Sequence, residues 1–406
     1  MGLNIQRIRN DFPILKLQVY NKPLVYFDNG ATTHKPEVVI QTVRELQEMY
    51  NSSIHRGLHY LSDQMTDRYE KARETVREFI NASSTNEIIF TSGTTGSVNA
   101  VAFSFGEKYV KKGDEILITE MEHHSNLVPW QMLCERKEAS LKVIPINDNG
   151  ELIIDSMGDL ISEKTKILAV VHASNSLGTV NPVREIIRRA HQRDIPVLVD
   201  GAQMVQHGKV DVQDLDCDFY AFSAHKIFGP TGSGVLYGKE AWLEDLPPYQ
   251  GGGDMVDQVT FDRTTYNSLP FKFEAGTTNF TGAIGLGAAL EYVRSVGIPE
   301  ISRYEEQLIR STLEKLEGIR GLTLFGRAPE RISVFSFLLE GIHPYDAGMI
   351  LDKMGIAVRT GTHCTQPVMD HFGIQGTIRA SLVFYNTEEE VVRFVEGVEK
   401  TITMLS

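Results

Sequence analysis

The stretch Asp216-Cys-Asp-Phe-Tyr-Ala-Phe-Ser-Ala-His-Lys-Ile-Phe-Gly-Pro-Thr-Gly-Ser-Gly234 decides how the rest of the chain is interpreted. Its apolar, aromatic run Phe219–Phe222 predicts a short buried strand. Lys226 follows that strand directly, at the point where Gly and Pro turn the chain. A lysine desolvated at the end of a core strand has a lowered pKa and keeps the free amine that a Schiff base requires.

A lysine beside a Gly-Pro turn is more often a solvated surface charge, so the surroundings must decide. Ser223 and Ala224 are small and let another group approach. A second apolar run, residues 196–199, ends in Asp200. A lysine and an aspartate at neighbouring strand ends form the pairing that binds pyridoxal 5'-phosphate (PLP), where the lysine holds the aldehyde carbon and the carboxylate keeps the ring nitrogen protonated.

Composition bounds the class of protein. The 406 residues suggest two domains or more, and 42% hydrophobic with 23% charged residues is typical of a globular protein. The net charge of −13 argues against nucleic acid and anionic membranes as partners. We expect no secretory signal, because the N-terminus has no long apolar region, and no membrane span, because the uncharged stretch 275–290 is rich in Gly and Thr. Three cysteines without a CxxC motif predict a reducing cytoplasm, no disulfides and no metal site.

Apolar strand patterns alternate with helical patterns from about residue 85 to 240, which predicts a mostly parallel sheet covered on both faces. Polar side chains follow these strands one after another. They are Thr94, Thr95, His123, Asn175, Asp200, Gln203, Ser223, His225 and Lys226. In open α/β sheets the ligand binds at this edge, so their shared placement is a stronger signal than any single residue.

The loop Ser92-Gly-Thr-Thr-Gly-Ser97 joins a predicted strand at 87–91 to a predicted helix at 96–110. Free N–H groups at the helix start and the hydroxyls of Thr94 and Thr95 would suit a phosphate. The loop lacks the Gly-Lys-Ser/Thr of a P-loop, and Gly/Thr loops are common. A further helix is expected at 62–81, with Ser62 as its N-cap.

Several other candidates keep a structural alternative. His123 could be a core histidine, and the loop carrying His55 and Arg56 either is solvated or brings both to an anionic substrate. Arg379 either pairs with a structural carboxylate or clamps a substrate carboxylate. Cys364 lies in a Gly-flanked loop with basic neighbours, residues 359–367, which we call the Cys364 loop. Basic neighbours favour a thiolate, although a lone cysteine is usually inert and buried.

The last third of the chain has a different pattern of predicted strands and helices. Strands near 322–326, 332–338, 356–360 and 377–383, with helices at 344–354 and 387–404, predict a smaller α+β unit. A long helical region at 281–318 precedes it, and the Thr-rich segment that follows Gly251–Gly253 predicts a hairpin or flap.

The motifs Asp200-Gly-Ala-Gln203, Ser223-Ala-His-Lys226, Glu122-His-His-Ser-Asn126, Arg359-Thr-Gly-Thr-His-Cys364 and Arg379-Ala-Ser381 occur in this order. With them the chain resembles the class V aminotransferase-like PLP enzymes, and within these the group II (SufS-type) cysteine desulfurases. The resemblance implies fold type I, a large, mostly parallel seven-stranded-type sheet domain plus a smaller α+β C-terminal domain. We expect an N-terminal arm at 1–20 that packs with the small domain, a large PLP-binding domain at 21–290, and a small domain at 291–406 that carries the Cys364 loop.

The same resemblance assigns roles. It makes Lys226, Cys364 and His123 catalytic: Lys226 forms the Schiff base and then shuttles protons, His123 stacks on the ring, and Cys364 accepts sulfur. The implied cofactor-binding residues are Thr94, Thr95, His123, Asn175, Asp200, Gln203, Ser223, His225, Lys226 and, from the other subunit of a homodimer, Thr278. The implied substrate-binding residues are Asn175, Arg359 and Arg379, joined by His55 and Arg56.

The implied reaction converts L-cysteine to L-alanine and leaves a persulfide on Cys364, which an acceptor protein of the SufE or SufU kind collects for iron–sulfur cluster assembly. Three alternatives stay open: a selenocysteine lyase, another PLP reaction such as transamination or kynureninase-like cleavage, and a non-catalytic scaffold. Two positions depart from the common pattern, Thr362 where relatives often have histidine and Ala224 where glycine is frequent. The first could change how the thiolate is activated.

Overall fold

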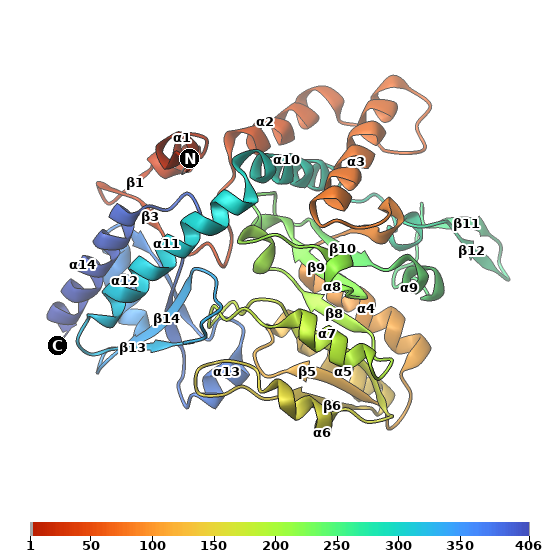
Figure 1. Ribbon diagram of the computed structural model, residues 1–406. Helices are drawn as coiled ribbons and strands as arrows, with labels where there is room; N and C mark the ends of the chain where they lie inside the picture. Colours follow the sequence, from red (N-terminus) through yellow and green to blue (C-terminus); the bar gives the residue numbers. More distant parts are fainter. Residues whose placement is uncertain (1–2, 406) are drawn as a thin grey trace.

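A large sheet forms the centre of the protein, whose computed structural model describes residues 3–405 (Figure 1). The sheet has seven strands in the order β4 (Ile88–Thr91), β10 (Gly234–Gly238), β9 (Phe219–Ser223), β8 (Val197–Asp200), β7 (Thr165–Val171), β5 (Glu115–Thr119) and β6 (Ser140–Ile144). β10 runs antiparallel to both of its neighbours, and the other pairings are parallel. The predicted large, mostly parallel sheet is therefore confirmed.

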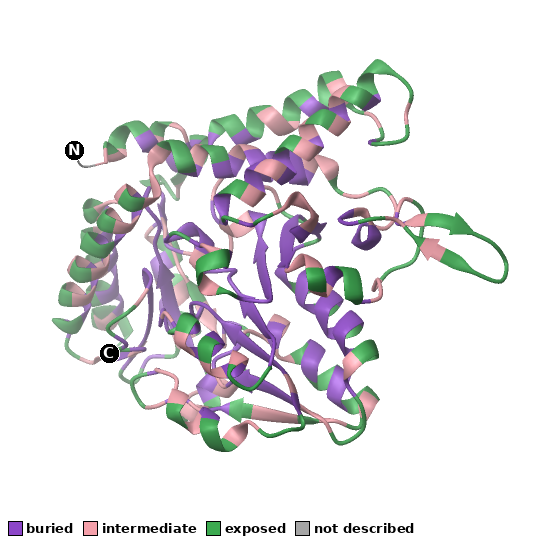
Figure 2. Ribbon diagram, turned by 45° about the vertical axis from the view of Figure 1, so that its right-hand side comes forward, coloured by how far each residue is buried: buried purple, intermediate pink, exposed green. Residues whose placement is uncertain are grey.

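Helices cover both faces of this sheet, so its strands other than the edge strand β6 are largely buried on both sides (Figure 2). In β9, Phe219 and Ala221 join the core under α4 (Thr94–Tyr109) and α5 (Val128–Lys137). Tyr220 and Phe222 point the other way, into the core under α3 (Tyr60–Phe79), α7 (Val183–His191) and α10 (Phe280–Val296). Because successive strand residues face opposite sides, a strand covered twice must be apolar throughout.

A second, four-stranded sheet forms the smaller α+β unit. Its strands are antiparallel, in the order β13 (Leu322–Phe325), β14 (Val334–Leu339), β17 (Thr377–Ser381) and β16 (Arg359–Gly361). α11 (Ile298–Glu317), α12 (Pro344–Lys353) and α14 (Glu388–Leu405) accompany it. The expected helical region at 281–318 is two helices, α10 and α11, because Gly297 separates them with a φ of 99°.

The N-terminal residues contact this smaller unit. β3 (Val25–Tyr26) pairs in parallel with β15 (Ile356–Ala357). Arg9, in α1 (Ile5–Asn10), donates to the Tyr385 carbonyl and forms an ion pair with Glu390. The domain boundaries after residues 20 and 290 stay predictions. β1 (Gln18–Val19) and β2 (Lys22–Pro23) make a short hairpin between α1 and β3.

The remaining elements are peripheral or connect the larger ones. They are α2 (Glu37–Glu45), α6 (Met157–Leu160), α8 (Val212–Leu215), α9 (Glu240–Asp245), α13 (Gln366–His371) and the strands β11 (Val256–Val259) and β12 (Thr264–Tyr266). β11 and β12 form the predicted hairpin, which projects from the body of the protein (Figure 1). Among residues 3–405, no helix combines the length and the apolar character needed to cross a bilayer.

The start of α3 differs from its prediction. The helix begins at Tyr60 rather than Ser62, and its N-cap is His59, whose ring Nδ1 accepts the Ser62 N–H. Ser62 therefore lies in the first turn, with a buried hydroxyl that has no hydrogen-bond partner. A histidine cap carries no common sequence signal, whereas serine is among the usual caps.

Candidate active site

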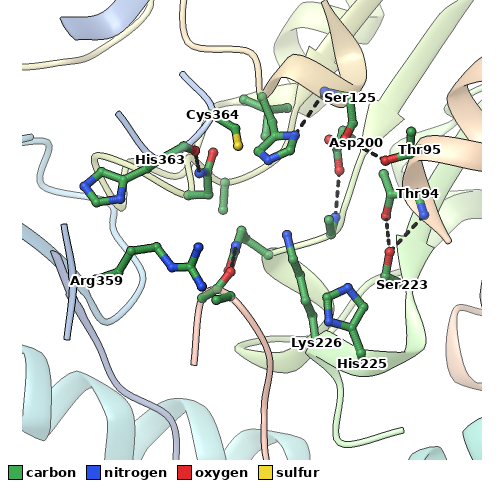
Figure 3. Close-up of a pocket in the computed structure, with 18 of the residues that line it drawn as sticks. Thr94, Thr95, Ser125, Asp200, Ser223, His225, Lys226, Arg359, His363 and Cys364 are labelled. Carbon is green, nitrogen blue, oxygen red and sulfur yellow. Dashed lines mark hydrogen bonds between the residues drawn. The ribbon is translucent and has the colours of Figure 1, made fainter. Parts of the chain in front are cut away.

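A cavity of about 250 Å³ lies where the carboxyl ends of β8 and β9 face the smaller sheet (Figure 3). Most of the residues predicted from sequence line it together. They are Thr94, Thr95, His123, Asn175, Asp200, Gln203, Ser223, His225, Lys226, Arg359, Cys364 and Arg379. The strands of the large sheet deliver most of these side chains to a single edge, as open α/β sheets do, and the smaller unit supplies Arg359, Cys364 and Arg379.

One wall of the cavity is a cup of hydroxyls at the start of α4. Gly93 precedes the helix with a φ of 129°, and a Cβ there would lie 3.1 Å from the Ser223 hydroxyl. The Thr94 N–H donates to that Ser223 hydroxyl at 2.8 Å, and the Thr94 hydroxyl lies equally close to it. Thr95 and Ser125 pair through their hydroxyls at 2.7 Å. Hydroxyls and unpaired helix N–H groups at a positive dipole end suit a phosphate.

Lys226 and Asp200 stand on adjacent parallel strands. Asp200 ends β8, opposite Ala221 of β9, and Lys226 lies in the short turn after β9. Burial lowers the pKa of Lys226 to about 8, against an opposing effect of the Asp200 charge. Burial also raises the pKa of Asp200, which accepts the Ala202 N–H at 2.9 Å. About a tenth of a lysine with that pKa is uncharged at pH 7, so the amine is available as a nucleophile or base.

His123 is held neutral with a defined tautomer. Its Nδ1 accepts the Ser125 N–H at 3.0 Å, so the proton of the neutral ring lies on Nε2. Burial lowers the pKa of His123 to about 3, and the neighbouring Lys226 charge adds to the effect. A neutral ring that lines the cavity can lie flat against an aromatic ligand and donate one proton from Nε2.

The N-terminal turn at 29–33 supports the floor of the cavity. The His225 carbonyl accepts the Thr33 N–H at 2.9 Å, and burial lowers the pKa of the His225 ring to about 4. Gln203 donates from its amide nitrogen to the Gly30 carbonyl at 2.8 Å. Its predicted contact with the oxygen of the cofactor ring stays a prediction, and the structure places its amide beside the cavity.

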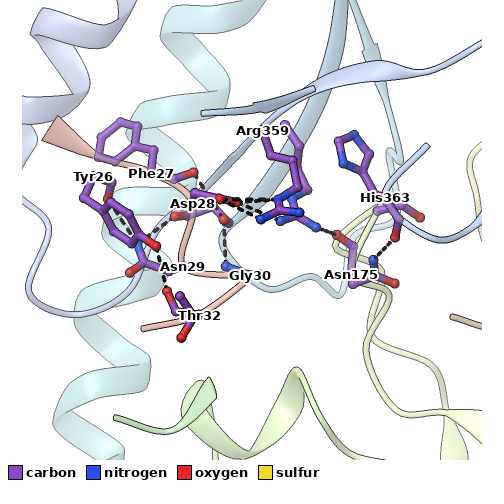
Figure 4. Close-up of polar contacts among 12 residues, drawn as sticks. Tyr26, Phe27, Asp28, Asn29, Gly30, Thr32, Asn175, Arg359 and His363 are labelled. Carbon is purple, nitrogen blue, oxygen red and sulfur yellow. Dashed lines mark hydrogen bonds and ion pairs between the residues drawn. The ribbon is translucent and has the colours of Figure 1, made fainter. Parts of the chain in front are cut away.

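Two arginines from the smaller unit complete the opposite wall (Figure 4). Arg379 of β17 is buried and donates to Asp28 Oδ1 at 3.1 Å and to the Asn175 carbonyl at 3.0 Å. Arg359 of β16 also donates to Asp28, through both Nε and Nη2. Two cations share a single carboxylate, so the cluster keeps one surplus positive charge that matches one ligand carboxylate.

Three buried polar atoms among the residues that line the cavity have no hydrogen-bond partner. They are Arg379 Nε, Asn175 Oδ1 and His363 Nδ1. A buried polar group is normally paired, and an unpaired one in a cavity wall indicates a missing ligand or water. With the hydroxyl cup, the Lys226–Asp200 pair and the neutral His123, the residues present fit PLP together with an amino-acid carboxylate.

Cys364 enters the same cavity from the Cys364 loop, between β16 and α13. His363 and Cys364 have φ angles of 55° and 58°, a left-handed conformation that costs about 1–2 kcal/mol for each such residue. Asn175 holds this strained backbone by donating to the His363 carbonyl at 2.7 Å, and His363 Nε2 pairs with the Thr377 hydroxyl at 2.9 Å. Thr362 is linked through its carbonyl, which accepts from Thr365.

The chain's three cysteines have different environments. Cys364 is exposed, whereas Cys134 and Cys217 are buried. Burial raises the pKa of Cys134 to about 11 and raises that of Cys217 further. Since the thiolate is the reactive form, burial makes Cys134 and Cys217 unreactive, and Cys364 is the cysteine exposed to a ligand.

Three predicted residues do not line this cavity. His55 pairs with Glu70 at 2.9 Å, Arg56 with Asp254 at 2.6 Å, and the Thr278 hydroxyl donates to Tyr69 at 3.3 Å. Thr278 was expected to act from another subunit. The ligand contacts predicted for all three residues therefore stay predictions.

Sequence reasoning missed two carboxylates of the site. Asp28 holds both arginines. It directly follows the apolar run Val25-Tyr-Phe27, which was the available signal. Glu122 is buried behind His123 and accepts from Thr119, Asn126 and the Val171 N–H at 2.5, 2.6 and 2.9 Å. Burial raises the pKa of Glu122 to about 8. Its three contacts join the ends of two strands to the turn that carries His123.

Fold and pocket together define a fold type I PLP-dependent enzyme, and comparison with known proteins narrows the class. The family model "Aminotransferase class-V" matches residues 25–394, so the chain belongs to that family. It is an enzyme homologous to cysteine desulfurases, and its cofactor is PLP.

Curated relatives and solved structures agree on this branch. A cysteine desulfurase of Escherichia coli is 48% identical over 406 residues, which cover both chains completely. One of Synechococcus elongatus is 49% identical over 403 residues, which are 99% of this chain but only 64% of that relative's length. Crystal structures of the Escherichia coli cysteine desulfurase CsdA and of an apo cysteine desulfurase from Thermococcus onnurineus superpose with TM-scores of 0.93 and 0.94. Each is 38% identical, with coverage of 100% of this chain and of 100% and 99% of theirs, respectively.

Proposed function

We propose that this chain is a cysteine desulfurase of the group II (SufS) type, which converts L-cysteine to L-alanine and keeps the sulfur as a persulfide on Cys364. One observation carries the proposal: an exposed cysteine lines the same cavity as a desolvated lysine and an arginine cluster with one surplus positive charge. A transaminase or a kynureninase-like enzyme has no use for a thiol at this place.

The residues that would hold PLP follow from the geometry. The hydroxyl cup of Thr94, Thr95 and Ser223 suits its phosphate, Asp200 its ring nitrogen and Lys226 its aldehyde carbon. When bound, the cofactor supplies an electron sink for the bonds at the substrate's α-carbon. His123, neutral and held by Ser125, fits against one face of the ring.

Arg379 and Arg359 are the groups suited to bind the substrate carboxylate. Arg379 Nε and Asn175 Oδ1 are free to meet the carboxylate and the amino group of an amino acid, respectively. Lys226 lines the same cavity, which supports a role for its uncharged amine in taking the α-proton and later returning it. Desolvation in the cavity lowers the pKa of Lys226 to about 8.

In the sulfur step the Cys364 thiolate attacks the substrate's sulfur. A sulfur–sulfur bond forms and the substrate's Cβ–S bond breaks, with its electron pair passing to the carbon. That carbon takes up a proton, so L-cysteine and a thiol become L-alanine and a persulfide, and no external oxidant or reductant is required. Lys226, which takes the α-proton, can supply the proton for this carbon, and the neutral His123 ring can donate a hydrogen bond from Nε2.

The sulfur then has to leave the enzyme. The exposure of Cys364 supports transfer to an acceptor protein of the SufE or SufU kind, for use in iron–sulfur cluster assembly. The placement of His55, Arg56 and Thr278 outside their own chain's cavity supports a homodimer in which they serve the partner's site. A persulfide chemistry that starts from a free thiol also implies the reducing cytoplasm.

The test is to trap the product on the enzyme. Purified holoenzyme is incubated with L-cysteine and alkylated, and the mass of the peptide that contains residue 364 is measured by mass spectrometry. We expect the mass of one added sulfur atom, with one alanine formed for each persulfide. Cys364→Ser should abolish both, and the buried-thiol control Cys134→Ala should change neither.

The same experiment separates the alternatives. Full cysteine turnover by Cys364→Ser would overturn the mechanism, and a keto-acid product would indicate transamination. A variant that loses cysteine turnover but still cleaves selenocysteine would add selenocysteine lyase activity to this chain. If the purified protein showed no visible cofactor absorption, the non-catalytic scaffold would be the remaining alternative.

A further inference from the structure

His124 makes two hydrogen bonds to the Cys364 loop, one at Cys364 itself and one just downstream of it. Its backbone N–H donates to the Cys364 carbonyl at 2.8 Å. Its ring Nε2 accepts the Gln366 N–H at 3.3 Å. His124 comes from the large sheet's edge, in the short turn after β5, and is not among the residues that line the cavity.

The loop needs such support because its backbone is strained. His363 and Cys364 are consecutive non-glycine residues with positive φ. Residues in sparsely populated conformations persist only where the surroundings hold them. Without restraint, the loop would relax to other conformations, and the thiol would move with it.

The supports on the two sides of Cys364 differ. Upstream, the smaller sheet fixes β16, and Asn175 holds the His363 carbonyl. Downstream, α13 packs Val368 and Met369 against the large unit. Gln366 is the first residue of α13, and the first N–H groups of a helix lack an intrahelical acceptor. The His124 ring supplies that acceptor, so it joins the start of the helix to the turn that carries His123.

We propose that His124 is a positioning residue that fixes the Cys364 thiol where sulfur transfer takes place. The proposal rests on the proposed function. It assigns the ring acceptor, Nε2, a mechanical role: the ring keeps the loop docked on the large unit while the thiolate attacks. The residue touches neither the substrate's arginine cluster nor the hydroxyl cup, so its effect should appear in turnover rather than in substrate binding.

The test compares two variants in the PLP-loaded enzyme. His124→Leu removes the ring acceptor at similar size, and His124→Gln restores an acceptor oxygen that does not titrate. Both keep the backbone N–H that holds the Cys364 carbonyl. Amide hydrogen exchange of residues 362–368 should accelerate roughly tenfold in His124→Leu, the change expected for one lost hydrogen bond. His124→Gln should return it close to the wild-type rate.

Kinetics supply the second readout. We expect kcat for L-cysteine to fall about tenfold in His124→Leu while KM stays within about twofold, because the interaction acts on the transition state. His124→Gln should recover most of kcat, and the cofactor's visible absorption should stay unchanged in both variants.

Three results would overturn the proposal: wild-type exchange and kcat in His124→Leu, a rise in KM at constant kcat, or a changed cofactor spectrum that His124→Gln fails to restore. The exchange measurement needs no cysteine, so it reports on His124 independently of the reaction. A wild-type enzyme that makes no alanine would overturn the proposed function instead, whatever the exchange shows.

Discussion

The two walls of the cavity are built in different ways. Lys226, Asp200 and His123, which we call the strand-end cluster, follow strands that are buried on both faces. Cys364 instead sits in an exposed loop with two left-handed residues, held by hydrogen bonds from the large unit. A cofactor that stays bound requires a rigid frame, whereas a thiol that must reach both a substrate and a second protein requires a loop that can be released.

Breaking the strand-end cluster should have the largest effect. Lys226→Ala removes the amine proposed to bind the cofactor and to move the α-proton, and acid–base catalysis alone contributes about 10²–10⁴ in rate. We expect alanine formation to fall by roughly 1,000-fold or more, and the visible absorption to shift from that of the lysine-bound cofactor. Lys209→Ala, which alters an exposed lysine paired with Asp211, is the control and should retain both. Near-normal turnover by Lys226→Ala would contradict the assignment.

The arginine wall should respond more moderately. Asp28→Asn removes the carboxylate that orients both Arg359 and Arg379. Hydrogen bonds to charged groups contribute about 2 kcal/mol, so we expect KM for L-cysteine to rise roughly 30-fold. The cofactor spectrum should not change, because the strand-end cluster is untouched. A fall in KM would instead mean that Asp28 competes with the substrate for the arginines.

The pH dependence of cofactor uptake tests the desolvation of Lys226. With a pKa of about 8, the uncharged fraction of this amine rises about tenfold from pH 7 to pH 9 and then levels off. The rate at which apoprotein binds PLP to Lys226 should follow that curve. Asp200→Asn should move the midpoint to lower pH, because the Asp200 charge raises the pKa of Lys226. A rate that still climbs steeply above pH 9 would indicate a solvated lysine.

The sequence was enough to predict the strand-end cluster, because apolar runs mark strands and the carboxyl ends of parallel strands meet at one edge. It could not predict the partners of the other wall. Asp28 and Arg379 are 351 positions apart, and the His124 contact with the Cys364 carbonyl runs through the backbone, where no residue type signals it. The N-cap at His59 was also missed, because histidine is not a residue type that usually signals a helix start.

The smallest expected effect concerns the hydroxyl cup, which belongs to the rigid wall of the cavity. Gly93→Ala places a Cβ at a φ of 129°, within 3.1 Å of the Ser223 hydroxyl that bonds Thr94. Backbone strain of this kind costs about 1–3 kcal/mol, so we expect a lower melting temperature and PLP affinity weakened about fivefold. Gly158→Ala, at a helical position where the added Cβ meets nothing within 4 Å, should leave both unchanged. If the cup holds the phosphate, excess PLP should restore turnover in Gly93→Ala. Normal PLP affinity in Gly93→Ala would show that the hydroxyl cup can change its conformation as easily as the Cys364 loop. The two walls would then not differ in rigidity.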